Sequence, residues 1–98
     1  MGIPDRGPFR KLNEWGMMDR LQSLRVFVAV ADAGSFAGGA RALGISAPSA
    51  TRGVAELEAA LGARLFTRTT RQMRLSEPGR AYLDEVRDIL AQLQAADE

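Results

Sequence analysis

The feature that most constrains the fold is a short glycine link between two segments with helical periodicity. Gly44-Ile45-Ser46 separates a helical segment of residues 35–43 from a second one of residues 46–61. Glycine ends a helix at no steric cost because it adopts the left-handed conformation, and serine begins a helix by capping its free N–H groups. So short a link places the two helices against each other, which predicts a helix-turn-helix.

A further helix is predicted upstream, over about residues 19–33. Asp19 is its expected N-cap, and Gly34 follows its last turn. Apolar side chains recur in it at spacings of three and four residues, which places them on one face. That face consists of Leu21, Leu24, Phe27, Val28 and Ala31.

The two helices beside the glycine link should each bury one face. In the first of them, capped by Ser35, the Gly38-Gly39 pair indicates a close approach to a neighbouring helix, because each glycine otherwise costs about 1 kcal/mol there. The second is capped by Ser46, has Pro48 in its first turn and ends at Gly62. The residues expected to be buried are Phe36, Ala40 and Leu43 in the first, and Ala50, Val54, Leu57 and Leu61 in the second.

The period changes after Gly62. Residues 65–68 and 73–75 are predicted to form two short strands around the polar turn 69–72. Ser76, with Pro78 two residues later, begins a last helix that continues to the C-terminus. Its apolar positions recur at three and four residues in a pattern similar to a coiled coil, which predicts a seam of Leu83, Val86, Leu90 and Leu93 flanked by Tyr82 and Ile89.

The predicted fold is therefore mainly α. It is a winged helix-turn-helix of three helices and a two-stranded β-ribbon, followed by a long dimerisation helix. Residues 1–17, rich in glycine and proline and without periodicity, are expected to be a flexible leader. The winged helix-turn-helix should occupy residues 18–75 and the dimerisation helix residues 76–98.

Composition excludes several classes of function. The 98 residues contain no cysteine and no histidine, so disulfides, thiolate metal sites and histidine acid–base chemistry are excluded. No nucleophile–base pair, phosphate-binding glycine loop or metal-ligand spacing is present, and we expect neither catalysis nor a cofactor nor a metal. The longest apolar run, residues 26–31, is too short to span a membrane. The lack of cysteine fits a reducing cytoplasm, where we expect the protein to act.

Charge is distributed unevenly along the chain. The net charge is only +1, yet residues 41–80 contain seven arginines and three acids, whereas residues 83–98 contain one arginine and five acids. A basic middle with an acidic tail is compatible with an anionic partner, and equally with a solvated surface.

The helix that begins at Ser46 and the ribbon contain the candidate DNA-binding residues. In a helix-turn-helix the N-terminal end of the second helix enters the DNA major groove, which accepts one α-helix. Arg52 can bind a guanine or a phosphate, and arginines around the ribbon tip suit phosphates or a narrow minor groove. The full set is Ser46, Ala47, Pro48, Ser49, Thr51, Arg52, Arg68, Arg71 and Arg74. Taken singly, the residues of the helix are better explained as helix-start residues and a solvated charge. Within the whole pattern, DNA contact is favoured for Thr51 and Arg52, and phosphate contact is favoured over a solubilising hairpin for the ribbon arginines.

Four stretches together resemble the N-terminal part of LysR-type transcriptional regulators. Residues 24–36 (Leu-Arg-Val-Phe-Val-Ala-Val-Ala-Asp-Ala-Gly-Ser-Phe) are similar to the opening helix of that family. Residues 40–52 (Ala-Arg-Ala-Leu-Gly-Ile-Ser-Ala-Pro-Ser-Ala-Thr-Arg) are similar to its helix-turn-helix. Residues 57–68 (Leu-Glu-Ala-Ala-Leu-Gly-Ala-Arg-Leu-Phe-Thr-Arg) and 75–79 (Leu-Ser-Glu-Pro-Gly) resemble the borders of its wing.

The resemblance implies a sequence-specific regulator that binds double-stranded DNA as a homodimer through its last helix, on an imperfect palindrome. Any small-molecule effector is expected to bind a C-terminal domain that these residues do not include. The chain departs from the family pattern at Gly39, at Ala47, where glutamine is frequent, and at Gly53, where the family has a longer residue. The last two departures alter the predicted reading helix.

Two other classes remain open at this point. Winged helices and coiled coils also bind proteins, in which case the basic ribbon would contact an acidic partner. Winged helices of the molybdate-responsive or multiple-antibiotic-resistance type are neighbouring DNA-binding classes, although the Leu-Phe-Thr-Arg run after Leu-Gly favours LysR or its molybdate-regulator relative.

Overall fold

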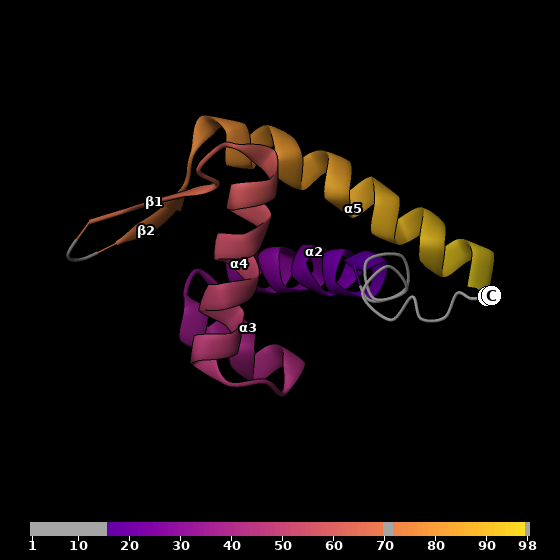
Figure 1. Cartoon of the computed structure of the whole chain (residues 1–98), viewed down its shortest axis with the longest axis horizontal. Helices are drawn as coiled ribbons and strands as arrows, with labels where there is room; N and C mark the ends of the chain where they lie inside the picture. The colour runs from indigo at the N-terminus through magenta and orange to yellow at the C-terminus, as the bar shows by residue number, and fades with distance from the viewer. Residues whose placement is uncertain (1–15, 70–71, 98) are drawn as a thin grey trace, which may run out of the picture.

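The structure, a computed structural model, describes residues 16–69 and 72–97, with side chains from Arg20 onward. Its elements follow in the order α2 (Gly16–Ala33), α3 (Phe36–Leu43), α4 (Ala47–Leu61), β1 (Phe66–Arg68), β2 (Met73–Leu75) and α5 (Glu77–Asp97) (Figure 1). We refer to α2, α3 and α4 as the three-helix body and to residues 66–75 as the wing. The predicted winged helix-turn-helix followed by a long helix is confirmed.

Helix α2 begins earlier than the sequence indicated. It starts at Gly16, so Asp19 lies inside the helix and the prediction that Asp19 is its N-cap is wrong. Residues 16 and 17, which were assigned to the leader, are helical, whereas residues 1–15 lie outside the described residues. Repeated apolar positions define a helix better than they define its first turn.

The helix-turn-helix is built by the predicted caps. Ser35 Oγ accepts from the N–H of Gly38 over 2.9 Å, and Ser46 Oγ accepts from the N–H of Ser49 over 3.2 Å. Between them Gly44 ends α3 with φ of +70°, a conformation that few other residues adopt without strain. These local signals set where α3 ends and where α4 begins.

The predicted close approach of α3 to a neighbouring helix occurs at Gly39. A Cβ atom added there would lie 2.7 Å from both the Cα and the N of Val30 in α2. The backbones of α2 and α3 are therefore in direct contact, and the missing side chain makes that contact possible.

The core fills the space between the three-helix body, β1 and the first turns of α5. The Phe27 ring of α2 lies 5.5 Å from the Phe66 ring and 5.8 Å from the Tyr82 ring, so one aromatic side chain joins α2 to the wing and to α5. Two residues expected in the core are not there. Leu43 is 36% exposed and Leu61 38% exposed, and each is the last residue of its helix, at the edge of the core.

The wing is a short antiparallel ribbon, closed at its base. Phe66 pairs with Leu75 and Arg68 with Met73, so β1 begins one residue later than predicted. Just outside the ribbon the N–H of Ser76 donates to the carbonyl of Leu65 over 2.9 Å, and the Ser76 hydroxyl donates to the carbonyl of Arg64. These two bonds fix the end of β2 and the start of α5 to the segment that connects α4 with β1.

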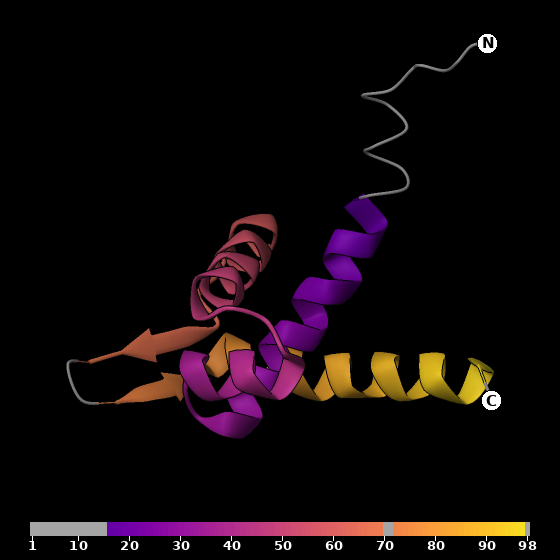
Figure 2. The ribbon, with the colours of Figure 1, turned by 90° about the horizontal axis from the view of Figure 1, so that it is seen from below.

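Helix α5 leaves the body on the side opposite to the wing (Figure 2). Its Leu83 and Val86 are buried in the core, whereas Ile89 is 47% exposed. Within the described residues, no helix combines the length and the apolar character needed to cross a membrane.

Candidate nucleic-acid interface

The N-terminal end of α4 is an ordered, exposed helix start. Besides capping the Ser49 N–H, the Ser46 hydroxyl donates to Ser49 Oγ over 2.8 Å. The Thr51 hydroxyl donates to the carbonyl of Ala47 over 3.0 Å, so its oxygen keeps only the capacity to accept a further bond. Pro48 has no N–H, and the N–H groups of Ser49 and Ala50 are both bonded to Ser46. What favours a negatively charged ligand here is therefore the positive end of the helix dipole.

The predicted reading residues of α4 lie together on its outer side. Ala47, Pro48, Thr51 and Arg52 are exposed and Ser49 is half-buried. The opposite face consists of Ala50, Val54 and Leu57, all of them buried in the core. Because the core holds that face, α4 presents its outer side in one fixed orientation.

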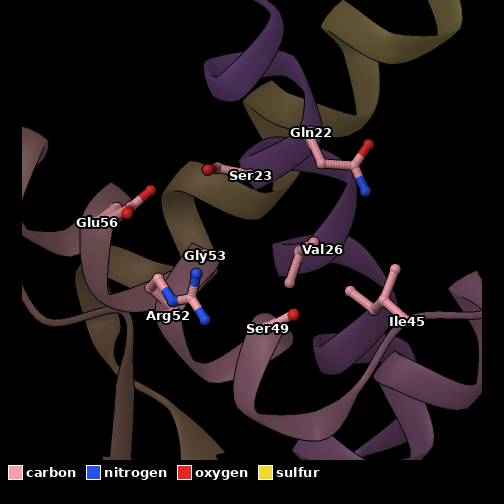
Figure 3. A pocket seen from close by; sticks show the side chains of 8 residues that line it. All are labelled: Gln22, Ser23, Val26, Ile45, Ser49, Arg52, Gly53 and Glu56. Carbon is pink, nitrogen blue, oxygen red and sulfur yellow. The ribbon is translucent and has the colours of Figure 1, made fainter. Parts of the chain in front are cut away.

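Arg52 lies at the edge of a hollow between α2 and α4. The hollow has a volume of about 320 Å³, and its lining includes Ser23 and Val26 of α2 and Ser49 and Glu56 of α4 (Figure 3). Gly53 has no side chain to fill part of this hollow. A Cβ atom added there would lie 3.6 Å from the Val26 side chain, an ordinary contact distance. Among the described residues Arg52 makes no ion pair or hydrogen bond, so its guanidinium is available to a ligand.

The wing arginines differ from one another in their surroundings. The Arg68 guanidinium lies 4.6 Å from the centre of the Phe36 ring, a cation–π contact between the wing and α3. Arg74 Nε donates to Gln72 Oε1 over 3.1 Å on the exposed side of the ribbon. Arg71 lies outside the described residues. Arg68 and Arg74 are both exposed, and Arg68 is also held against the body.

Sequence reasoning did not identify Glu58 as an orienting residue. Its carboxylate, 13% exposed, accepts from the N–H of Leu65 over 2.8 Å and from that of Phe66 over 3.4 Å. Arg64 Nε lies 3.7 Å from the same oxygen. Glu58 therefore connects the last turns of α4 to the first residues of the wing. The contact joins residues seven and eight positions apart, and periodicity alone does not reveal it.

The six residues predicted for dimerisation fall into two groups. Leu83 and Val86 are buried within their own chain, and the half-buried Tyr82 packs on Phe27. Ile89 is exposed, and Leu90 and Leu93 are half-buried. A second chain therefore has access mainly to the three residues in the later turns: Ile89, Leu90 and Leu93.

Comparison with known proteins agrees with this geometry. Residues 21–80 match the family described as bacterial regulatory helix-turn-helix proteins, lysR family. The HTH-type transcriptional regulator TfdT of Cupriavidus pinatubonensis is 43% identical over 74 residues, which are 76% of this chain and 32% of that protein. An HTH-type transcriptional repressor of Pseudomonas aeruginosa is 43% identical over 76 residues, or 78% of this chain and 24% of that one. The chain thus spans a third or less of these two relatives.

Solved structures show the same similarity in three dimensions. The crystal structure of a CbnR_DBD–DNA complex has a TM-score of 0.75 and 38% identity, and covers 79% of this chain and 88% of that one. The complex of BenM_DBD with catB site 1 DNA has a TM-score of 0.74 and 30% identity, and covers 78% and 82%. Both of these structures are complexes with DNA, and each matches more than three quarters of this chain.

Proposed function

The chain belongs to the lysR family of bacterial regulatory helix-turn-helix proteins, and from this premise we propose that it binds double-stranded DNA as the reading domain of a transcriptional regulator. One observation carries the proposal. The outer side of α4 presents Arg52 without a protein partner beside a capped helix start, while the opposite face is fixed in the core. This is the arrangement that a helix needs in order to enter a major groove.

The family also bears on catalysis. The matched relatives are named as transcriptional regulators, so the prediction that the chain is not an enzyme is confirmed by its family.

The binding mode that we propose uses two copies of the chain. Ile89, Leu90 and Leu93 in the later turns of α5 bring two chains together, and each α4 enters one major groove of an imperfect palindrome. Two-fold symmetry of the protein requires such symmetry of the site, with half-sites about one or more helical turns apart. The cytoplasm, where bacterial DNA lies, is the proposed place of action.

The contacts divide between α4 and the wing. Arg52 reads a base edge, most simply a guanine, through two of its N–H donors. Ser46, Ser49 and Thr51 lie next to it and contact phosphates or bases, and Ala47 and Pro48 offer apolar contact to a thymine methyl. The wing residues Arg68, Arg71 and Arg74 bind the flanking backbone or the minor groove.

The experiment is selection of duplexes from a random-sequence library, followed by affinity measurements on the selected duplex. Affinity should fall steeply with salt concentration, as expected when arginines release counterions from phosphates. Arg52→Ala should weaken binding by about 1–3 kcal/mol and relax the preference at one base pair. Arg80→Ala is the charge-matched control, because Arg80 is exposed in the first turn of α5, outside α4 and outside the residues proposed for pairing.

Two outcomes would refute the proposal. Equal affinity for random and selected duplexes would favour a protein-interaction module instead. An Arg52→Ala variant that binds the selected duplex as tightly as the parent would remove α4 from the interface.

A further inference from the structure

An ion pair joins α2 to α5 just before Leu90, the last apolar residue of α5 that packs on the core. Arg87 Nη2 donates to Asp32 Oδ1 over 2.6 Å, although the two residues are 55 positions apart. The hydrogen bond to Asp32 raises the pKa of the Arg87 guanidinium, and the negative charges of Asp32 and Asp84 act in the same direction. The pair links two elements that local sequence does not connect.

The end of α2 makes this position favourable for a cation. Asp32 lies in the last turn of α2, where the helix dipole places partial negative charge. No basic residue of α2 itself occupies that turn. Arg87 of α5 therefore supplies the positive charge that both the Asp32 carboxylate and the helix end attract.

Arg87 follows directly after the last fully buried residue of α5. Tyr82 packs on Phe27, and Leu83 and Val86 are in the core. Beyond Arg87, Leu90 still packs on the edge of the core. A hollow then lies between α5 and Arg25 of α2, and no hydrogen bond or ion pair joins residues 88–97 to the described part of the body. The pair is thus the last polar connection before α5 extends away from the body (Figure 2).

This position has mechanical consequences. From Arg87 to Asp97 the helix extends about 15 Å, so a tilt of about 10° at Arg87 displaces its end by almost 3 Å. That displacement approaches the rise of one DNA base pair, about 3.4 Å.

We propose that Asp32 and Arg87 are positioning residues that fix the angle at which α5 leaves the three-helix body. The consequence for DNA rests on the proposed function: when two chains pair through α5, this angle sets the distance between their two α4 helices. Both side chains are about half exposed, 53% for Asp32 and 47% for Arg87, so the pair adds little to overall stability. The ion pair instead acts on the direction of α5 relative to the three-helix body.

The angle can be measured in the full chain without DNA. The chain has no cysteine, so Ala59→Cys on α4 and Ala95→Cys on α5, both exposed, accept two spin labels. Distances between the labels are recorded with labelled protein diluted in unlabelled protein. Asp32→Asn and Arg87→Gln should each broaden the distance distribution, or shift its centre, by about 2–3 Å, the displacement expected for a small tilt of the helix.

Three further variants distinguish orientation from general damage. Asp88→Asn removes a neighbouring exposed charge from α5 and should leave the distribution unchanged. Arg87→Lys keeps the charge and should stay close to the parent, and the exchange Asp32→Arg with Arg87→Asp should restore the parental distribution. Circular dichroism melting verifies that each variant is folded. If the folded Asp32→Asn and Arg87→Gln variants give the parental distribution, the proposal is overturned.

A DNA measurement then tests the consequence. The selected duplex is compared with versions whose half-sites are one base pair closer or farther apart, and with a single half-site. Asp32→Asn should lower the ratio of affinities between the selected and altered spacings severalfold, while binding to the single half-site stays unchanged. An unchanged ratio of affinities would refute the role of the ion pair in half-site spacing. If the parent chain bound no duplex specifically, the proposed function would be refuted, and the distances between the spin labels would still test the angle of α5.

Discussion

At the scale of single residues, two glycines inside helices have opposite surroundings. A Cβ atom at position 39 would lie 2.7 Å from backbone atoms of Val30, whereas one at position 53 would lie 3.6 Å from the Val26 side chain, an ordinary contact distance. Glycine inside a helix costs about 1 kcal/mol relative to alanine. Close packing explains why position 39 needs a glycine. At position 53, in contrast, no contact in the structure requires a glycine.

We therefore expect Gly53→Ala to stabilise the chain. The added methyl group contacts Val26, partly fills the hollow beside Arg52 and removes a flexible position from α4. The free energy of unfolding should rise by about 1 kcal/mol and the melting temperature by about 4–8 °C, measured by thermal unfolding. Gly39→Ala is the matched control and should lower the melting temperature. A lower melting temperature for Gly53→Ala would contradict this reading.

The candidate site shows which residue properties the sequence could reveal. The exposure of Thr51 and Arg52 follows from helical periodicity, because Ala50, Val54 and Leu57 define the opposite face. The contact of Arg68 with Phe36 could not be predicted in this way. It depends on where the wing lies relative to α3, which only the folded chain determines.

At the scale of elements, one carboxylate couples α4 to the wing. Glu58 of α4 accepts from the N–H of Leu65, just before β1, and from that of Phe66, the first residue of β1, and both residues are buried in the core. A buried N–H without an acceptor costs about 1–3 kcal/mol. The contact therefore fixes the direction in which the chain leaves α4.

Glu58→Ala should lower the free energy of unfolding by about 1–3 kcal/mol, because both N–H groups lose their charged acceptor. Glu56→Ala serves as the control, since Glu56 is exposed and lies on the same helix. Urea unfolding measures both variants. Equal stability of the two would show that the carboxylate does not support the wing.

Local chemistry explains which elements the sequence predicted well. Ser35, Gly44 and Ser46 determine the boundaries of α3 and α4 through contacts within three or four residues, and those boundaries are confirmed. The start of α2 was wrong because Asp19 resembles a cap but lies inside a longer helix. Leu43 and Leu61 follow the apolar period, yet each lies at the edge of the core. Periodicity gives the face of a helix, and tertiary packing decides how far that face is buried.

At the scale of the whole molecule, α5 has two separate roles along its length. Its early turns, with Leu83 and Val86, complete the core of the chain. Its later turns project Ile89 outward, on the surface that we propose for pairing. The coiled-coil-like spacing of these residues could not distinguish the two roles, since a residue that packs on its own chain and one that packs on a partner repeat with the same period.

Substitutions in the two parts of α5 should therefore have different effects. Ile89→Glu should weaken self-association while the melting temperature of the monomer changes little, as is usual for an exposed position. Val86→Ala should instead lower the free energy of unfolding by about 1–3 kcal/mol, because it leaves a cavity in the core. Analytical ultracentrifugation and thermal unfolding separate the two effects. A parental association constant for Ile89→Glu would place the pairing surface elsewhere.

The closed base of the wing separates the tip from the rest of the molecule. The bonds from Ser76 to the carbonyls of Leu65 and Arg64 hold both ends of the ribbon in place, whatever lies between them. Lengthening a loop costs little once its ends are fixed, about 0.6 kcal/mol for a doubling of its length. We therefore expect the fold to tolerate a longer loop between Thr69 and Gln72, so that the contacts of this loop can change while α4 and α5 keep their relative positions.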